Sequence, residues 1–526
     1  MPDDLDLQSL LDRVDPAVRP VLVAILNHVE ALTAENQALR ETVRRLEDEV
    51  RRLKGEHPAP QRSAAKPPPA DRSSEKERRK SRPRHRGKRP PIHIDRTMKV
   101  RVDRAGLPAD ARFKGWVKTV VQEVVLVRQN TRFLREKFYS PSTGRTYLAD
   151  LPAGYEGGFG PGTKTLALGL CYGANVSFAQ VKAFLRDAGL RISTGRVASL
   201  LTRKLDGFHA EADEVLRAGL SSSTAHGIDT TPTSVAGQTW HAHALCNPFY
   251  TFYHTTPTKE RLAALAALQG GRPVQFRLDA LTLEGLAESK VGRKHRLALE
   301  ALPWEVTLDA ALFQELLEVH LPTASADVKK RIAEAAALSA YRSQQEVPLP
   351  QVLVGDDAPQ WRRLAELALC WIHDGRHYKL LCPSLAHHRQ LLKQFRARYW
   401  EYYRQLVAYA ETPNRARAAA LSEEFDALFA TATGYALLDQ RIARTKGKKT
   451  ELLRVLDDPT VPLHNNATEL AERRRVRKRD ASLAAKTPAG VRVWDTFQGL
   501  AETTAKLRVS YLECLRYRMM QAGHGA

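Results

Sequence analysis

Three carboxylates in this sequence stand in settings that suit chemistry with divalent cations: Asp229, Asp356 and Glu469. Carboxylate oxygens are ligands of Mg²⁺, and paired ions of this kind promote displacement at phosphorus. The chain is also strongly basic, with 81 Lys and Arg against 59 Asp and Glu and a formal charge of +22. Such an excess of positive charge attracts a phosphate backbone. The acids amid this charge predict cutting or joining of nucleic acid with two Mg²⁺ ions, for which Mn²⁺ could substitute.

Apolar and polar residues alternate around the first two acids as they do in β-strands. Strands are expected over 224–229, 238–245 and 249–255, followed by a helix over 259–268. This order is the opening of an RNase H-like sheet, with Asp229 at the end of the first strand. A further strand over 350–356 places Asp356 on the same face as Val354, because side chains alternate with period two. Asp357 points to the other face, so Asp356 is the preferred second acid.

The third acid stands at the start of a helix. Asn465 and Asn466 are typical of a helix start, which puts Glu469 in the first turn and makes the two amides candidate accessory residues. Glu472 on the same helix is a weaker alternative. Basic side chains further along this helix are expected to face DNA, and they are Arg473, Arg475, Arg477 and Lys478. His373 could position a phosphate or a metal-bound water, or could simply lie in a polar part of the sheet.

The N-terminal region carries a heptad repeat from 22 to 53. Leucines occupy successive d positions at Leu32, Leu39 and Leu46, and Asn36 occupies an a position. A single Asn at an a position fixes register and favours two parallel strands. The pattern predicts a parallel coiled coil that makes the chain a homodimer or a larger assembly; the alternative is a lone amphipathic helix packed on the body of the protein.

Two further regions could contact DNA. The segment 57–95 is rich in Pro, Ser, Arg and Lys, cannot form a core, and is either a DNA-binding tether or a solubilising linker. After a small module of strands and turns over 96–162, three short helices over 163–220 have the outline of a helix-turn-helix. Its last helix is expected to present Arg196, Thr202, Arg203 and Lys204 to DNA, and core packing is the competing interpretation.

Five scattered cysteines indicate a reducing compartment rather than a disulfide framework. No run of about 18 apolar residues is present, so we expect no membrane association and a place in the cytoplasm, at the nucleoid. Cys370, His373, His377 and Cys382, with His387 and His388 nearby, offer an alternative zinc site, although their spacing fits no standard finger.

The ordered motifs resemble the DDE transposases of the insertion sequence 66 family. The resemblance rests on segments at 228–232, 352–356, 370–373, 465–469, 475–479 and 503–512. It reads 370–373 as a strand, and it implies an RNase H-like catalytic domain that binds transposon ends, cleaves them and joins them to double-stranded target DNA. His464 stands where members commonly carry Asp, and the region 92–165 has no cysteine for a zinc finger.

Together these patterns predict a multidomain chain of the α+β or α/β class. The expected order is a coiled coil over 1–56, the linker, the small module, the helix-turn-helix region, a DDE catalytic domain over 221–482 with a helical insertion over 271–349, and a helical tail over 483–526. A catalytically inactive DNA-binding relative and an RNase H-like nuclease are the alternatives to a transposase.

Overall fold

The computed structural model describes residues 13–53, 92–103, 106–108, 110–155, 158–300, 302–482 and 485–521. The chain divides into two units, one comprising 1–72 with 132–526 and the other 73–131. The described part of the second unit contains no β-strand or α-helix. The basic linker up to residue 91 lies outside the described residues.

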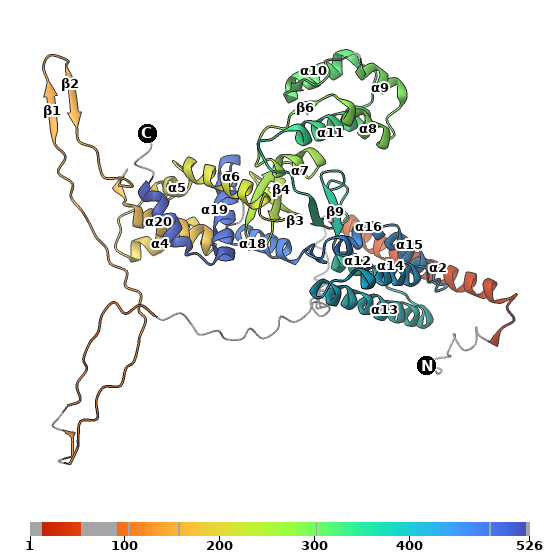
Figure 1. The fold of residues 1–526 in the computed structure, drawn as a ribbon, viewed down its shortest axis with the longest axis horizontal. Coiled ribbons are helices and arrows are strands. Elements are labelled where there is room, and N and C mark those ends of the chain that lie inside the picture. The colour runs from red at the N-terminus through yellow and green to blue at the C-terminus, as the bar shows by residue number, and fades with distance from the viewer. Residues whose placement is uncertain are drawn as a thin grey trace. The chain divides into compact units, whose positions relative to one another are not determined.

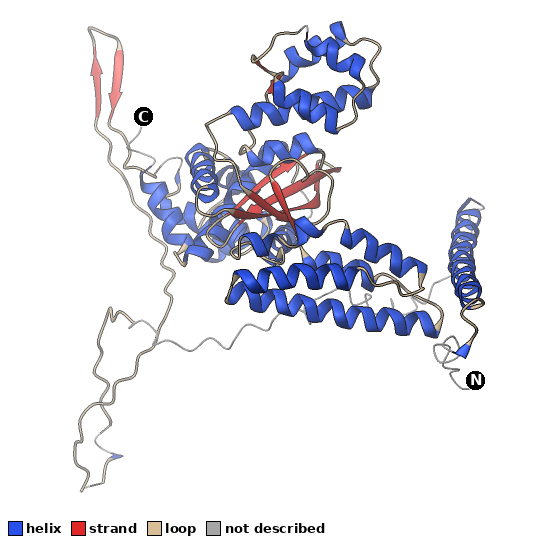
Figure 2. Cartoon of the chain, turned by 45° about the vertical axis from the view of Figure 1, so that its right-hand side comes forward, coloured by secondary structure: helices blue, strands red, loops and turns tan. Residues whose placement is uncertain are grey.

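A five-stranded mixed sheet lies at the centre of the larger unit (Figure 2). Its order is β5-β4-β3-β8-β9, with β3 antiparallel to β4 and parallel to β8. The strands are β3 (Ala225–Val235), β4 (Gln238–Cys246), β5 (Thr251–Thr256), β8 (Val352–Gly355) and β9 (Glu366–Leu369). The four strands expected around the first two acids are therefore present, and β3 continues six residues beyond Asp229 to form a hairpin with β4. Both faces of β8 are buried, which explains its continuous apolar run.

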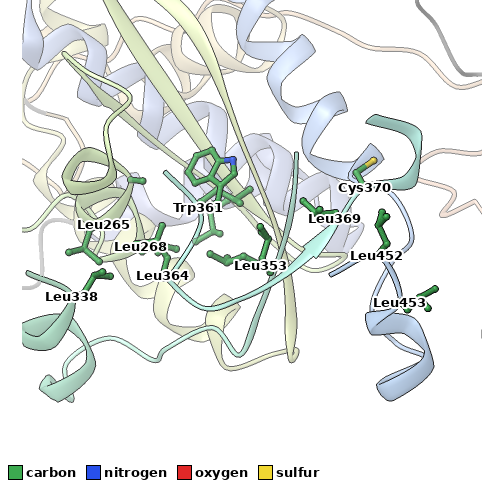
Figure 3. Close-up of a cluster of buried hydrophobic side chains, with 14 of the residues drawn as sticks. Leu265, Leu268, Leu338, Leu353, Trp361, Leu364, Leu369, Cys370, Leu452 and Leu453 are labelled. Carbon is green, nitrogen blue, oxygen red and sulfur yellow. The ribbon is translucent and has the colours of Figure 1, made fainter. Parts of the chain in front are cut away.

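Two helical blocks accompany the sheet. One interrupts it in sequence between β5 and β8, and the other follows β9. The first follows α7 (Arg261–Leu268) and occupies the predicted insertion. Its elements are β6 (Phe276–Arg277), α8 (Ala280–Glu288), α9 (Arg293–Glu300), β7 (Thr307–Leu308), α10 (Ala310–His320) and α11 (Ala326–Ser343). Asp279, Asp309 and Ser325 accept backbone N–H bonds that start three of these helices. An apolar cluster joins this block to the sheet, from Leu338 past Trp361 and Leu353 (Figure 3).

The second block lies between β9 and the helix of the third acid. It consists of α12 (Trp371–Lys379), α13 (Ala386–Glu411), α14 (Arg415–Phe429), α15 (Ala436–Lys446), α16 (Lys449–Leu452) and α17 (Arg454–Asp457). The expected strand over 370–373 is wrong, because Cys370 precedes the first turn of α12. Trp371 and Tyr378 pack on aromatic residues of α13, and this helix contact outweighs the local strand pattern.

A helical body is formed by two distant stretches of the chain. The elements before the sheet are α3 (Pro161–Leu168), the π-helical turn η3 (Gly169–Gly173), α4 (Phe178–Asp187), α5 (Thr194–Thr202) and α6 (Asp206–Leu220), and they pack against α19 (Pro488–Leu507) and α20 (Tyr511–Gln521). Ser177 and Gln180 form a capping box at the start of α4. Because α19 and α20 belong to it, the C-terminal tail is part of this helical body.

Of the module expected over 96–162, the structure has one hairpin, β1 (Lys137–Ser140) and β2 (Arg145–Leu148).

The N-terminal helix α2 (Arg19–Leu53) covers the heptad region (Figure 1). Leu32, Leu39 and Leu46 are about half exposed, at 45%, 56% and 56%, and Asn36 is exposed as well. Within one chain the heptad face is therefore uncovered, so its pairing stays a prediction. Among the described residues no helix is long and apolar enough to cross a membrane.

Candidate active site

The first two acids lie where the parallel pairing of β3 with β8 ends. The two strands run parallel with Gly227 opposite Val354. Two residues further on, the same register leads to Asp229 on β3 and to Asp356 just past the end of β8. Asp229 is not the end of its strand, as the sequence had suggested, because β3 continues to Val235 in the hairpin with β4. The register nevertheless brings together two residues that lie more than a hundred positions apart.

Glu469 reaches the same edge from α18 (Asn466–Ser482). Asn465 fixes the start of this helix: its side-chain amide donates to the Ile228 carbonyl at 2.9 Å, and its backbone N–H faces the Cys370 sulfur at 3.3 Å. Gly227 allows the approach, because a Cβ there would lie 2.1 Å from the Thr468 hydroxyl. The predicted accessory residue Asn465 is thus a buried joint between β3, α12 and α18, and it sets the position of Glu469. Asn466, half-buried, follows as the first residue of α18.

Asp229 has an unusual protonation equilibrium. Burial raises the pKa of its carboxyl to about 7, the Thr230 N–H bond at 2.8 Å opposes this, and the charges of Asp356 and Glu469 raise it further. Arg376 acts in the opposite direction. The three acids are therefore close enough to influence one another electrostatically.

Asp229→Asn is expected to stabilise the protein at alkaline pH in the absence of divalent cations. Since the folded pKa lies above the unfolded value, wild type loses stability as pH rises from about 4 to about 7. The amide removes this loss, which amounts to a few kcal/mol because each pKa unit corresponds to about 1.4 kcal/mol. Denaturant unfolding in EDTA at pH 5 and pH 8 measures it. If the difference in free energy of unfolding between Asp229→Asn and wild type were no larger at pH 8 than at pH 5, the raised pKa of Asp229 would be contradicted.

Asp356 is held by its own loop. Its Oδ1 accepts from the Trp361 indole N–H at 2.9 Å and from the Ala358 N–H at 3.2 Å. Asp356 also lines a cavity of about 400 Å³, together with His373, Arg376 and Lys448. Asp357 pairs with Arg362 and Lys448, which supports the choice of Asp356 as the second acid.

Arg376 is a site residue that the sequence analysis missed. From α12, its guanidinium donates to the Glu469 carboxylate at 3.0 Å, and His373 Nε2 lies 3.6 Å from the same oxygen. His373, predicted as an accessory residue, is therefore beside the third acid. Glu472 is a poor substitute for Glu469, because burial raises its pKa well above the ordinary value, with the Asp229 charge adding to the effect.

Part of this site lies in a segment that is similar to a known protein family. Residues 352–493 match the model of the transposase IS66 family. This part of the chain is an IS66 family transposase domain. The matched IS66 segment contains Asp356, Arg376 and Glu469, whereas Asp229 and strands β3 to β5 precede it.

One curated relative of this chain is an uncharacterized protein, y4jO, of Sinorhizobium fredii. It is 29% identical over 310 residues, which cover 58% of this chain and 94% of the relative. No solved structure matches the chain.

Carboxylates are the donors that a hard divalent cation prefers, and Asp229, Asp356 and Glu469 lie near one edge of the sheet. In the described part of the chain, however, no three His, Cys, Asp or Glu side chains are grouped closely enough to hold a metal ion together. Glu469 is instead paired with Arg376. The alternative zinc set of Cys370, His373, His377 and Cys382 is not grouped in this way either.

Arg376→Gln is expected to increase the response of the protein to divalent cations. The substitution removes the guanidinium that neutralises Glu469, so a cation no longer competes with it for the carboxylate. The rise in unfolding temperature on adding Mn²⁺ should be larger than in wild type. Lys379→Gln, one turn further along α12 and outside the cavity, should behave as wild type. Equal Mn²⁺ responses in both variants would contradict the competition.

Two of the basic residues assigned to DNA are buried. Arg475 and Lys478 are both 0% exposed. Arg475 donates to Asp495 at 2.6 Å and to Gln498 at 2.8 Å, and Lys478 donates to the Cys171 carbonyl at 2.7 Å. Their predicted contact with DNA is therefore wrong: they join α18 to α19 and to η3.

The remaining basic candidates are accessible. Arg473 and Arg477 are exposed on α18. Arg203 and Lys204 are exposed but follow α5 rather than lie on it, because the helix ends at Thr202. Arg196 is half-buried on α5, with its guanidinium 5.8 Å from the Phe159 ring centroid.

Proposed function

We propose that this protein is a DNA transposase that binds transposon ends, cleaves them and joins them to target DNA. The observation that carries the proposal is the meeting of Asp229, Asp356 and Glu469 at one edge of a mixed sheet. The strand order and directions support an RNase H-like catalytic domain. The IS66 family match supports the same chemistry.

In the proposed reaction, Asp229, Asp356 and Glu469 would hold two Mg²⁺ or Mn²⁺ ions, which when bound supply positive charge at the reacting phosphate. Asn465 and Gly227 keep the start of α18 against β3, so that Glu469 stays at the sheet edge. His373 and Arg376 face the same carboxylate, and both line the cavity beside Asp356, where they can contact a phosphate.

DNA binding is proposed for the exposed basic residues. Arg473 and Arg477 extend from the helix of the third acid, so a backbone contacting them passes the acids. Arg196, Arg203 and Lys204 would bind ends through the helices before the sheet. Because these three residues precede the sheet in sequence, one molecule would have two DNA-contacting regions.

Two copies are proposed to associate through the heptad face of α2. Its apolar positions are uncovered in the single chain, and Asn36 selects a parallel pair. A dimer can bridge two similar ends, which favours transposition over simple hydrolysis.

Incubation with labelled inverted-repeat ends, a plasmid, and Mg²⁺ or Mn²⁺ tests the function. Joined product supports a transposase, nicks alone would indicate a nuclease, and retarded but intact DNA would indicate an inactive DNA-binding relative.

A further inference from the structure

The N-terminal helix has a second face that is used inside the chain. Glu30 on α2 is 4% exposed. Its carboxylate accepts from the Ser384 N–H at 2.6 Å, from the Ser384 hydroxyl at 2.8 Å and from the Leu385 N–H at 3.1 Å. Ser384 contacts Oε1, whereas the Leu385 N–H and His388 Nδ1, the latter at 3.2 Å, contact Oε2. A buried carboxylate is thus fully engaged by one short segment.

That segment is the start of α13. The first N–H groups of a helix have no partner within it, and Leu385 at the N-cap supplies no side-chain acceptor. Glu30 accepts the N–H of Leu385 at the N-cap and of Ser384 just before it, and its negative charge faces the positive end of the helix dipole. A residue 354 positions earlier therefore caps α13.

Asn27, one turn earlier on α2, makes the corresponding contact with α15. Its Nδ2 donates to the Gly434 carbonyl at 2.8 Å, and its Oδ1 accepts from the Ala436 N–H at 2.9 Å. Tyr435 at the N-cap of α15 offers no side-chain cap of its own. Successive turns of α2 thus complete two helices of the second helical block.

The capping face and the heptad face of α2 are different. Asn27 and Glu30 point into the chain, whereas Ile25, Val29 and Leu32 are 52%, 41% and 45% exposed. The spacings follow two separate stripes of one helix. Glu35 and Arg40 at the g and e positions add complementary charge for a second copy.

We infer that α2 is a bracket: Asn27 and Glu30 clamp it to α13 and α15 while its heptad face binds α2 of a second copy. The clamp then fixes the orientation of the two catalytic units relative to each other. This inference rests on the proposed dimer but not on strand transfer.

Spin labels test it in the full-length chain. Exposed Gln394 on α13 is changed to Cys, with Cys382→Ser and Cys514→Ser, and the distance between labels in the two copies is measured without DNA. The starting protein should give one narrow distribution. Asn27→Ala with Glu30→Gln should remain dimeric by sedimentation but give a broad distribution, whereas Glu41→Gln, on the exposed side of α2, should stay narrow.

Hydrogen exchange gives a second readout in the same variants. The amides of Ser384, Leu385 and Ala436, which lose their acceptors, should exchange roughly fivefold faster. A narrow distribution that persists in the clamp variant would overturn the inference, and so would a starting protein with no signal between copies. Neither readout involves DNA. If the unmodified protein fails to join ends, the proposed function is refuted, but the inference about α2 is not affected.

Discussion

Replacing Asp229 or Asp356 by Asn, or Glu469 by Gln, is expected to abolish end cleavage and strand transfer while DNA binding persists. Each change removes a charge and keeps the side-chain shape, so the loss reports on the carboxylate. Stabilisation of the reacting phosphate by bound ions amounts to several kcal/mol. Since about 1.4 kcal/mol is tenfold in rate, we expect a loss of roughly 1000-fold or more. Labelled ends and a plasmid with Mg²⁺ or Mn²⁺ provide the measurement.

Asp357→Asn is the matched control for this series. Asp357 is adjacent to Asp356 in sequence, but it pairs with Arg362 and Lys448. The Asp357→Asn variant should retain strand transfer. Normal joining by any one of the three acid variants would remove that residue from the site, whichever way the others behave.

Breaking the buried pair of Arg475 and Asp495 is expected to destabilise the protein strongly. Either substitution by Ala leaves an uncompensated charge in the interior, which costs about 3–5 kcal/mol. In Asp495→Ala, Thr255 would also lose the acceptor of both its N–H and its hydroxyl. The urea midpoint of unfolding measures this effect.

Arg477→Ala is the matched control, two residues further along α18 and exposed. It should change stability by less than about 0.5 kcal/mol. It should instead weaken DNA binding. The slope of log affinity against log salt concentration should also become shallower by about one, as expected for the loss of one phosphate contact. A variant of Arg475 that unfolds as wild type but binds DNA poorly would reverse the assignment of these two residues.

The sheet and two of its acids could be predicted because their signals are local. The residue types over β3, β4 and β5 are typical of strands, and Asp356 directly follows the end of β8. Asp229 was placed at a strand end, whereas β3 continues six residues beyond it. The helical block between β9 and α18 went unrecognised as a unit, since α12 begins with Cys370 and Trp371, residues that suit a strand equally well. Its position depends on aromatic packing with α13, which no short window contains.

Arg376 could not be found from local pattern, because its partner Glu469 lies 93 residues away. The burial of Arg475 and Lys478 did leave a signal. With Thr468 and Ala471 they follow a spacing of three, four and three, the buried stripe of a helix, but the density of positive charge on α18 suggested a solvated face. Charge alone is a weak guide where a distant Asp495 can neutralise it.

The contact between α18 and α19 also bears on how the protein is made. Asp495 is translated after every other residue that binds Arg475 except Gln498. A nascent chain therefore carries all three acids before the buried charge of Arg475 is neutralised, and we expect its fold to be completed only once α19 has been made. Prematurely terminated copies would be substrates for cellular proteases rather than long-lived competitors for the ends.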